Sequence, residues 1–313
     1  MTKKKKYEAG MAQLRFKPDF DWDVASAREL YTNTKFAFEV DQIRYSDCIA
    51  GMKDLPEESV DLIIADPPFG IDFDKMGSQY RRDDGYVAEG YSEVDGDYDK
   101  FTYAWIEQLP RIMKESSSAY IFSGWTNLID VLSAAKNAGL ILINHIIWKY
   151  QFGVFTKNKF VTSHYHILFL VKNESKYFFN KIVHYPEDVW NIKRTYRPGQ
   201  QKNSTKLPEK VVKKCIDFSS KPGDLVLDPF MGNGTTAVCA KGTLRHYLGF
   251  EMNEIMKQII ESNLSEIKVG EFYQPYITLK PSPEELAKKY PAVRRYLEQL
   301  EKDKNHKDIT EFV

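Results

Sequence analysis

Short apolar runs alternate with amphipathic stretches through most of the chain, and this alternation predicts a sheet covered by helices. Residues 60–65 and 224–227 are mostly apolar, which is typical of strands buried on both faces of a parallel sheet. The same pattern predicts strands at 118–122, 140–148, 166–171 and 247–250. Helical spacing predicts helices at 105–113, 128–138, 208–218, from 235 onward, 281–290 and 291–302.

Both of the first two runs end in a carboxylate followed by a tight turn. The first turn is Asp66-Pro67-Pro68-Phe69, and the second extends from Asp228 to Thr236. Ligands bind at the carboxyl ends of the strands in an open α/β sheet, so both turns are candidate functional segments. Either turn alone could be an ordinary strand-ending turn, because Gly, Asn and Pro are common there. The occurrence of both favours a functional site.

The first turn suits a reaction at a weakly nucleophilic amine. The exocyclic nitrogen of adenine or cytosine shares its lone pair with the ring and must leave that conjugation before it can attack. The Asp66 carboxylate and the Pro67 carbonyl can each accept one N–H bond and so direct the lone pair. Pro67 and Pro68 hold the loop in a stiff geometry, and Phe69 offers a flat face for a base swung out of its duplex.

The second turn has the features of a cofactor loop. Gly232 and Gly234 allow the backbone to pass close to a ligand, and Thr235 opens a helix whose N-terminus can face an anionic group. The apolar step 247–250 ends at Glu251, which is placed to bind ribose hydroxyls. The sequence has no Gly-Lys-Ser/Thr segment that would grip phosphates, which argues against a P-loop nucleotide site.

With these motifs, residues 40–265 resemble the S-adenosylmethionine-dependent DNA amino-methyltransferases of the β type, in which the catalytic motif precedes the cofactor motif. The resemblance implies a permuted Rossmann-like α/β sheet, mostly parallel with an antiparallel edge strand at 166–171, and DNA-recognition insertions. It implies S-adenosyl-L-methionine as cofactor and double-stranded DNA as substrate. The implied catalytic residues are Asp66, Pro67, Pro68 and Phe69, and the implied cofactor-binding residues are Asp47, Lys206, Asp228, Phe230, Gly232, Gly234, Thr235 and Glu251.

The sequence departs from the family pattern at three positions. Leu207 separates Lys206 from the proline that usually follows it, Asn233 stands where many members have Ser, and Phe69 replaces the commoner Tyr. In the resembled family, Asp at the first position of the catalytic motif usually accompanies adenine-N6 specificity. The sequence therefore favours a site-specific adenine-N6 enzyme, with an N4-cytosine enzyme, an RNA methyltransferase and a catalytically inactive DNA-binding subunit as alternatives.

Charge is unevenly distributed although the 313 residues carry 44 basic and 44 acidic side chains. Residues 149–214 contain 14 Lys and Arg against 4 Asp and Glu, a net of +10, interleaved with aromatic residues. This composition is typical of nucleic-acid binding. Within it, Lys193, Arg194 and Arg197 are the candidate DNA contacts. Residues 72–100 contain 9 acidic against 4 basic residues, a net of −5, and are expected to form a loop beside the catalytic turn.

We expect five segments: an N-terminal arm and uncertain element at 1–43, the catalytic half at 44–149 with a loop insertion at 72–103, the edge strand and DNA-recognition region at 150–203, the cofactor half at 204–270, and a helical extension at 271–313. The lysine-rich start is expected to be a solvated or disordered tail.

Other features bear on partners and location. His164 and His166 are expected to be DNA-facing or structural, and no metal site is expected. Three unpaired cysteines and the lack of a long apolar stretch indicate a cytoplasmic protein without membrane association. A cognate restriction endonuclease and a second copy of the chain are the partners considered besides DNA.

Overall fold

The computed structural model describes residues 3–68, 98–151, 153, 156–194 and 206–310, and these form two compact units. The larger unit contains residues 24–179 and 187–273, and the smaller contains 1–23, 180–186 and 274–313. Within the described part of the chain, no helix is both long enough and apolar enough to cross a membrane.

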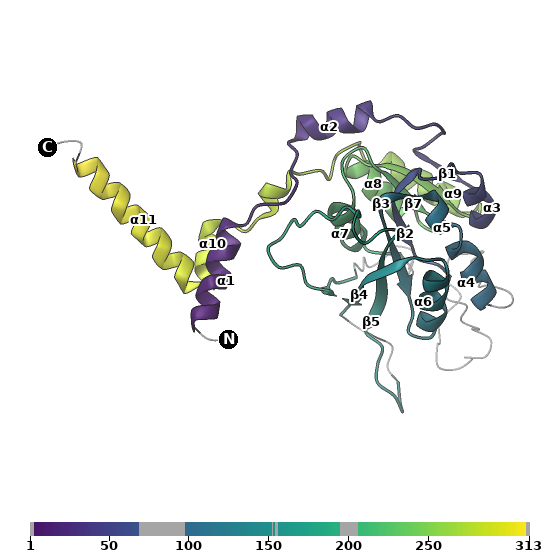
Figure 1. Ribbon diagram of the computed structural model, residues 1–313, viewed down its shortest axis with the longest axis horizontal. Helices are drawn as coiled ribbons and strands as arrows, with labels where there is room; N and C mark the ends of the chain where they lie inside the picture. Colours follow the sequence, from purple (N-terminus) through teal and green to yellow (C-terminus); the bar gives the residue numbers. More distant parts are fainter. Residues whose placement is uncertain (1–2, 69–97, 152, 154–155, 195–205, 311–313) are drawn as a thin grey trace. The chain divides into compact units, whose positions relative to one another are not determined.

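The larger unit is built on an eight-stranded sheet in the order β1-β8-β7-β2-β3-β5-β4-β6 (Figure 1). Its strands are β1 (Gln42–Arg44), β2 (Val60–Ala65), β3 (Met113–Ser123), β4 (Ile141–Lys149), β5 (His164–Val171), β6 (Val189–Asn191), β7 (Leu225–Asp228) and β8 (His246–Phe250). All neighbours pair in parallel except β5, which runs antiparallel to both β3 and β4. The mostly parallel α/β class is confirmed.

The antiparallel strand differs in position from the prediction. β5 lies inside the sheet between β3 and β4, with β6 beyond them, so it is not an edge strand. Its residues from His166 to Val171 are all buried, as expected for a strand covered on both faces. The short β6 takes the edge instead, and exposed residues flank its buried Trp190.

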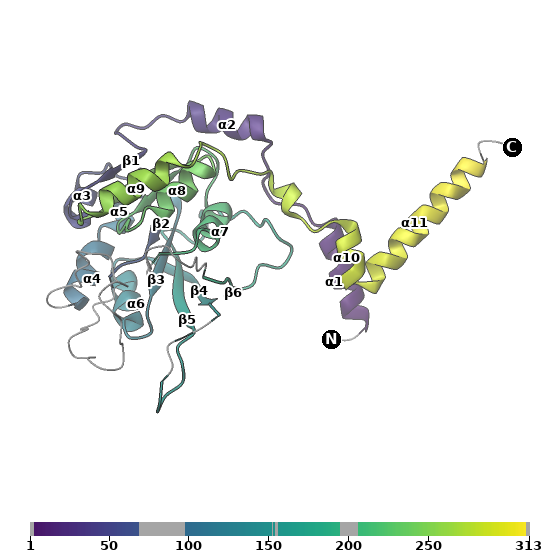
Figure 2. The same cartoon turned by 180° about the vertical axis from the view of Figure 1, so that it is seen from behind.

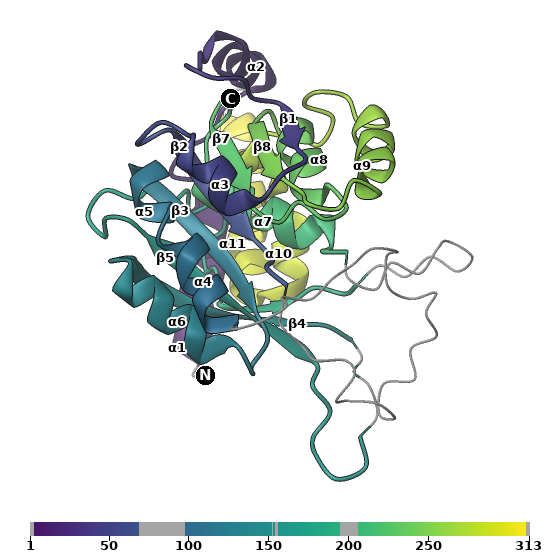
Figure 3. The ribbon, with the colours of Figure 1, turned by 90° about the vertical axis from the view of Figure 1, so that its right-hand side faces the viewer.

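Helices cover both faces of this sheet (Figures 2 and 3). One face carries α3 (Cys48–Lys53), α4 (Tyr98–Ile106), α5 (Leu109–Ile112) and α6 (Leu128–Asn137), and the other carries α7 (Glu209–Ser219), α8 (Thr235–Gly242) and α9 (Met256–Ser265). The side chains of β2 alternate between these two layers: Leu62 and Ile64 join one core, and Ile63 joins the other. All six residues of β2 are buried.

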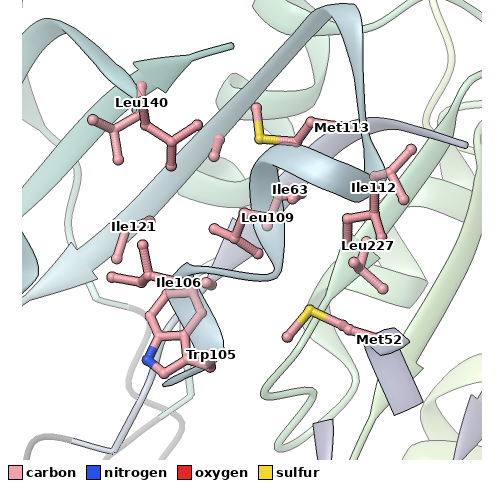
Figure 4. Close-up of a cluster of buried hydrophobic side chains, with 14 of the residues drawn as sticks. Met52, Ile63, Trp105, Ile106, Leu109, Ile112, Met113, Ile121, Leu140 and Leu227 are labelled. Atoms are coloured by element: carbon pink, nitrogen blue, oxygen red, sulfur yellow. The ribbon is translucent and has the colours of Figure 1, made fainter. Parts of the chain in front are cut away.

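The core beneath α3 to α6 is drawn in Figure 4, where Trp105 and Ile106 of α4 lie near Ile121 of β3. Close approach of the layers depends on a glycine at one place. A Cβ on Gly51 of α3 would lie 2.0 Å from Cε1 of Phe250 in β8. Any larger residue would therefore push α3 away from the sheet, and that helix follows directly after Asp47.

Most predicted elements are confirmed, including the helices at 128–138 and 208–218 and the strands at 140–148 and 247–250. The single helix predicted for 105–113 is wrong. α4 ends at Ile106, α5 covers only Leu109–Ile112, and Met113 already begins β3. Pro110 explains the break, because it has no N–H to continue the ladder and is tolerated in the first turn of α5.

The smaller unit corrects the expectation of a solvated or disordered N-terminal tail. Residues Lys3–Arg15 form the helix α1, and Met11 packs with Leu286 of α10 (Pro283–Lys289) and Val293 of α11 (Pro291–Thr310). This contact supplies the apolar burial that an isolated lysine-rich helix lacks. The sequence pattern missed it because the partners lie at opposite ends of the chain.

Polar contacts hold the rest of the smaller unit. The fully buried Asn180 amide both donates to the carbonyl of Phe20 and accepts from its N–H, each at 3.0 Å. The Asp21 carboxylate accepts from the N–H groups of Tyr276 and Ile277 at the start of the 3₁₀ helix η2 (Tyr276–Leu279). Ser282 and Glu285 form the reciprocal cap that begins α10, within the predicted helix at 281–290.

Candidate active site

Two carboxylates come together where the neighbouring strands β2 and β7 end. Leu62 and Ile63 of β2 pair in parallel with Val226 and Leu227 of β7, so Asp66 and Asp228 leave the sheet at the same edge. The chain continues from β2 to β3 on one side and from β7 to β8 on the other. This reversal of direction is a switch point, where open α/β sheets form a ligand-binding crevice.

Asp66 is held in an environment that opposes its ionisation. Burial and the nearby Asp228 raise the pKa of Asp66 to about 7, while the positive charge of Arg194 lowers it. The side chain is nevertheless partly exposed, as is Pro68, whereas Pro67 between them is buried. A carboxylate that changes protonation near neutral pH and still reaches the surface can accept a hydrogen bond or a proton from a ligand.

Asp228 organises the loop that follows β7. One carboxylate oxygen accepts from the Phe230 N–H at 2.9 Å, and the other accepts from the Thr236 hydroxyl at 2.6 Å. Burial is the largest cause raising the pKa of Asp228 to about 7; these two hydrogen bonds oppose the shift, and Glu251 adds to it. Asp228 therefore ties the strand end to the first turn of α8.

Glu251 ties the same loop to the end of β8. Its two carboxylate oxygens accept from the N–H groups of Gly232 at 2.7 Å and Asn253 at 2.8 Å. Burial raises the pKa of Glu251, and the hydrogen bonds from Asn253 and Gly232 oppose that shift. Each oxygen retains acceptor capacity after one such bond, so Glu251 can also receive hydroxyl groups of a ligand.

The glycines of the loop have the backbone freedom that the sequence predicted. Gly232 has φ of 53° and Gly234 has φ of 79°, both in the left-handed region that favours glycine. A Cβ on Gly234 would lie 3.1 Å from Cγ2 of Ile260 in α9. Gly234 begins α8 without a side-chain cap, so the N-terminus of that helix is available to an anionic group.

These groups fit the chemistry of a zwitterionic amino-acid moiety attached to a nucleoside. The uncapped start of α8 suits a carboxylate, the acids Asp66 and Asp228 suit a positive charge, and Glu251 suits a ribose diol. Thr235 and Thr236 are both buried at the start of α8. Thr236 belongs to the predicted loop, and the structure adds that its hydroxyl donates to Asp228.

Other predicted cofactor residues have contacts within the protein. The Asp47 carboxylate caps α3 by accepting from the Ala50 N–H at 2.8 Å. Lys206 lies 3.9 Å from Glu209, and the Phe230 ring packs edge-on against Trp105 at 5.1 Å between centroids. Phe230 thus contributes its backbone N–H to the loop while its ring anchors the loop to α4.

Two further residues, Met252 and Tyr45, lie beside Glu251. Met252 follows it directly and is 74% exposed, an unusual state for a large apolar side chain that could cover a flat ring. Tyr45 lies beside the same acid, and burial together with Glu261 and Glu251 raises its pKa. Met252 could have been identified from the sequence by its place after the strand-ending acid.

Arg194 occupies a cage of three aromatic rings, and its guanidinium lies 5.1 Å from the ring centroid of Trp148, 4.8 Å from Tyr150 and 5.2 Å from Tyr165. The Gln151 amide fixes its backbone by accepting from the Arg194 N–H and donating to its carbonyl, each at 2.9 Å. Lys193 next to it is exposed. Phe69, Arg197 and most of the 72–103 insertion lie outside the described residues.

The histidines on β4 and β5 contact one another. His145 and His166 share a hydrogen bond of 2.7 Å, and His164 lies edge-on to His166. Burial and the two neighbouring histidines lower the pKa of His166 to about 4. Across the described ranges, no group of three or more His, Cys, Asp or Glu side chains is arranged to hold a metal ion.

Comparison with known proteins gives one family. Residues 60–262 match the family model described as DNA methylase. The type II methyltransferase M.HinfI of Haemophilus influenzae is 31% identical over 248 residues, which cover 71% of this chain and 67% of that protein. The DNA adenine methyltransferase YhdJ of Escherichia coli (strain K12) is 30% identical over 287 residues, which cover 82% of this chain and 89% of that protein.

Solved structures show the same fold at lower identity. The M1.HpyAVI–SAM complex aligns with a TM-score of 0.55 and 22% identity, covering 71% of this chain and 98% of that one. The PvuII DNA methyltransferase, described as cytosine-N4-specific, aligns with a TM-score of 0.57 and 16% identity, covering 75% of this chain and 99% of that one. These likenesses show the fold and do not indicate which base this chain acts on.

Proposed function

The chain belongs to the DNA methylase family, and from this premise we propose that it transfers a methyl group from S-adenosyl-L-methionine to the exocyclic N6 of adenine at specific sites in duplex DNA. The observation that carries this proposal is the position of Asp66 and Asp228 at the ends of adjacent parallel strands. This position supports a catalytic turn and a cofactor loop that act at the same edge of the sheet.

Asp66 and Pro67 prepare the amine in this proposal. The Asp66 carboxylate and the Pro67 carbonyl each accept one N–H of the target amine, which turns its lone pair out of the ring plane. The nitrogen forms its new bond to carbon as the carbon–sulfur bond breaks, without a covalent intermediate on the protein. With a pKa of about 7, Asp66 can take up the proton that the methylated nitrogen releases and return it to water.

The cofactor half supplies binding and orientation. When bound, S-adenosyl-L-methionine provides a methyl group on a positively charged sulfur atom. Glu251 accepts the ribose hydroxyls, Met252 covers the adenine ring, and the start of α8 with Thr235 receives the carboxylate of the methionine part. Gly232 and Gly234 allow the close approach, while Asp228 and Phe230 hold the loop in shape. Asp47 and Lys206 have a supporting role beside the adenine and methionine ends.

Adenine is favoured over cytosine as the target. In the family, Asp at the first position of the tetrapeptide usually accompanies adenine, and YhdJ, 30% identical to this chain, is named a DNA adenine methyltransferase. The cytosine-N4-specific PvuII enzyme is 16% identical and supports the fold alone.

The test is incubation with radiolabelled S-adenosyl-L-methionine and unmethylated genomic DNA, followed by enzymatic digestion and separation of the nucleosides. We expect the label in N6-methyladenine. Label in N4-methylcytosine would support the same mechanism with cytosine, not adenine, as the target base. An RNA of matched composition serves as the control substrate. If the protein binds the cofactor and DNA but no labelled methyl enters either DNA or RNA, the result would indicate a catalytically inactive binding subunit.

Several finer assignments belong to the same proposal. Lys193, Arg194 and Arg197 are proposed DNA contacts on the strength of the basic 149–214 segment, with Arg194 acting from within its aromatic cage. The name of M.HinfI as a type II methyltransferase supports a cognate restriction endonuclease as a partner. Three buried free cysteines are compatible with a reducing cytoplasm, and a homodimer remains a proposal to be tested by sedimentation.

A further inference from the structure

A hairpin between β4 and β5 extends beyond the sheet (Figures 1 and 3). Its two legs stay together past the ends of the strands, because the Tyr150 N–H donates to the Ser163 carbonyl at 3.1 Å. Further out, a Cβ on Gly153 would lie only 2.2 Å from the Thr162 carbonyl oxygen. The described legs are therefore closely packed.

The tip of this hairpin presents an aromatic side chain to solvent. The Thr156 hydroxyl donates to the Lys159 carbonyl and closes the turn, and Phe160 follows it. Phe160 is 100% exposed, the highest value among the large apolar side chains of the described residues. Single exposed apolar residues are common, but a fully exposed Phe at the end of a closed hairpin has no contact within the fold that accounts for it.

The position of the hairpin relates it to the candidate active site. β4 runs in the same direction as β2, because both β3 and β4 pair antiparallel with β5 and β3 pairs parallel with β2. The hairpin therefore leaves the sheet at the edge where Asp66 lies. β4 is three strand positions from β2, which corresponds to about 14 Å. The hairpin continues past the end of β4 at Lys149, so its tip lies beyond this edge of the sheet.

The charge of the hairpin suits a polyanion. The whole stretch 149–172 has no Asp or Glu, and Lys157 and Lys159 flank the tip, where both are exposed. Lysines beside an aromatic tip can contact phosphates on either side of an opened base step. Aromatic and other apolar side chains enter such steps in proteins that unstack or bend DNA.

We propose that Phe160 is the wedge of this enzyme: its ring enters the duplex beside the target base and occupies the space that the flipped base leaves, while Lys157 and Lys159 hold the adjoining phosphates. This inference rests on the proposed function, since it requires a base to leave the stack. It adds a residue that acts on the DNA duplex and not on the reacting amine. Because Phe160 is fully exposed, its replacement leaves the core of the protein unchanged.

The test compares Phe160→Ala with Phe160→Trp and with Tyr185→Ala. Tyr185 is 77% exposed in the smaller unit and serves as the matched loss of an exposed aromatic ring. The methylated sites of genomic DNA treated with the unaltered enzyme are first mapped by sequencing. Two synthetic duplexes carrying that site are then used: one fully paired, and one with a mismatch opposite the target base, where flipping costs less.

On the paired duplex, we expect Phe160→Ala to lower kcat/KM about 10- to 100-fold, and on the mismatched duplex the loss should shrink to about threefold or less. Phe160→Trp and Tyr185→Ala should stay within about threefold of the unaltered enzyme on both duplexes. A 2-aminopurine at the target position should show less fluorescence increase with Phe160→Ala than with the unaltered enzyme.

Two outcomes would overturn the wedge while leaving the proposed function intact: Phe160→Ala methylating the paired duplex as fast as the unaltered enzyme, or losing activity equally on both duplexes. Failure of the unaltered enzyme to methylate any DNA would instead overturn the proposed function, and the wedge with it.

Discussion

The neighbouring strands β2 and β7 each have one acidic residue near either end. Together they form one pair of acids at the amino ends and another at the carboxyl ends, and the two pairs have different surroundings. Asp61 and Asp224 lie at the amino ends, and Asp66 and Asp228 at the carboxyl ends. Asp61 and Asp228 are buried, and Asp66 and Asp224 are partly exposed. What differs is the source of the compensating positive charge.

At the amino ends, the protein supplies that charge itself. Lys114 binds both oxygens of Asp61 at 2.7 and 2.8 Å, and the Leu225 N–H donates to the same carboxylate. Burial and Asp61 raise the pKa of Asp224, and Lys221 and Arg245 oppose that rise. Arg245 is fully buried and donates to Ser220 and Thr243. This end holds the strands together.

At the carboxyl ends, the acids outnumber the cations. Among the described residues, Arg194 is the one positive charge that lowers the pKa of this group, and it acts on Asp66. The excess of negative charge is suited to a cationic ligand, such as a sulfonium with its ammonium group. The comparison teaches that the acids paired with cations of the protein have a structural role here, whereas the acids that outnumber the nearby cations form the proposed reaction centre.

The largest effect should come from the carboxyl end. Asp66→Ala removes one acceptor of the target amine, so we expect kcat to fall by about 10²- to 10³-fold or more. Affinity for S-adenosyl-L-methionine, measured by calorimetry, should change little. Unchanged turnover, or a matching loss of cofactor affinity, would contradict the role given to Asp66 and leave the two ends without a functional difference.

The matched change at the amino end should affect stability and not chemistry. Asp61→Ala leaves Lys114 and the Leu225 N–H without their acceptor, and the free energy of unfolding should fall by about 2 to 4 kcal/mol, reduced because Lys114 is partly exposed. Urea denaturation measures the loss. The kcat of the folded fraction should stay within about twofold, and a larger loss of kcat would erase the distinction between the ends.

A third prediction concerns the pH dependence of activity, which Arg194 affects through the pKa of Asp66. The charge of Arg194 lowers the pKa of Asp66, so Arg194→Met should raise that pKa and shift the acidic limb of the kcat/KM profile to higher pH. The charge of Asp228 opposes Arg194 by raising the pKa of the same Asp66 carboxyl. We expect a loss of roughly three- to tenfold at pH 6 that narrows by pH 8.5. Arg194→Lys should retain most of the original profile, and a pH-independent loss in both variants would assign Arg194 to DNA binding alone.

The smallest effect should come from His246 at the amino end of β8. Burial lowers its pKa, but hydrogen bonds to the Asp41 carboxylate and the Tyr31 carbonyl, together with the charge of Asp41, outweigh burial and raise it. The resulting stabilisation is fully present below about pH 6.5 and is lost as pH rises through the folded-state value. Unfolding free energies from pH 6 to 9 should show this as less than about 1 kcal/mol. In Asp41→Asn the slope should flatten, and an unchanged slope would point to another group.

The sequence predicted the two ends unequally. Asp66 and Asp228 follow apolar runs and stand in short motifs, so both their positions and their proposed roles could be inferred from neighbours in the chain. Asp61 interrupts an apolar run, and nothing near it indicates that Lys114 lies 53 residues away in sequence but within hydrogen-bonding distance. Local patterns identify strand ends well, and they carry no information on which distant side chain provides a charge.

The same limit explains the errors in the fold. The internal place of β5 depends on β4 folding back beside it and on β6 covering the edge, which are pairings between distant segments. The aromatic cage of Arg194 is likewise built from residues at or near three strands, β4, β5 and β6. The sequence indicated only that basic and aromatic residues alternate in this region. The helix break near Pro110, in contrast, could have been predicted from that single proline, although the sequence pattern was interpreted as one continuous helix.

The pairing of β2 with β7 also has a consequence for how the protein is made. The hydrogen bond from the Leu225 N–H to Asp61 joins residues 164 apart, and β2 meets β7 only after all the intervening strands have been synthesised. A sheet with such distant central partners has a high contact order, which slows folding. During synthesis, the proposed catalytic turn therefore leaves the ribosome long before the proposed cofactor loop. The nascent chain cannot act on DNA until the last strands of the sheet insert beside the first.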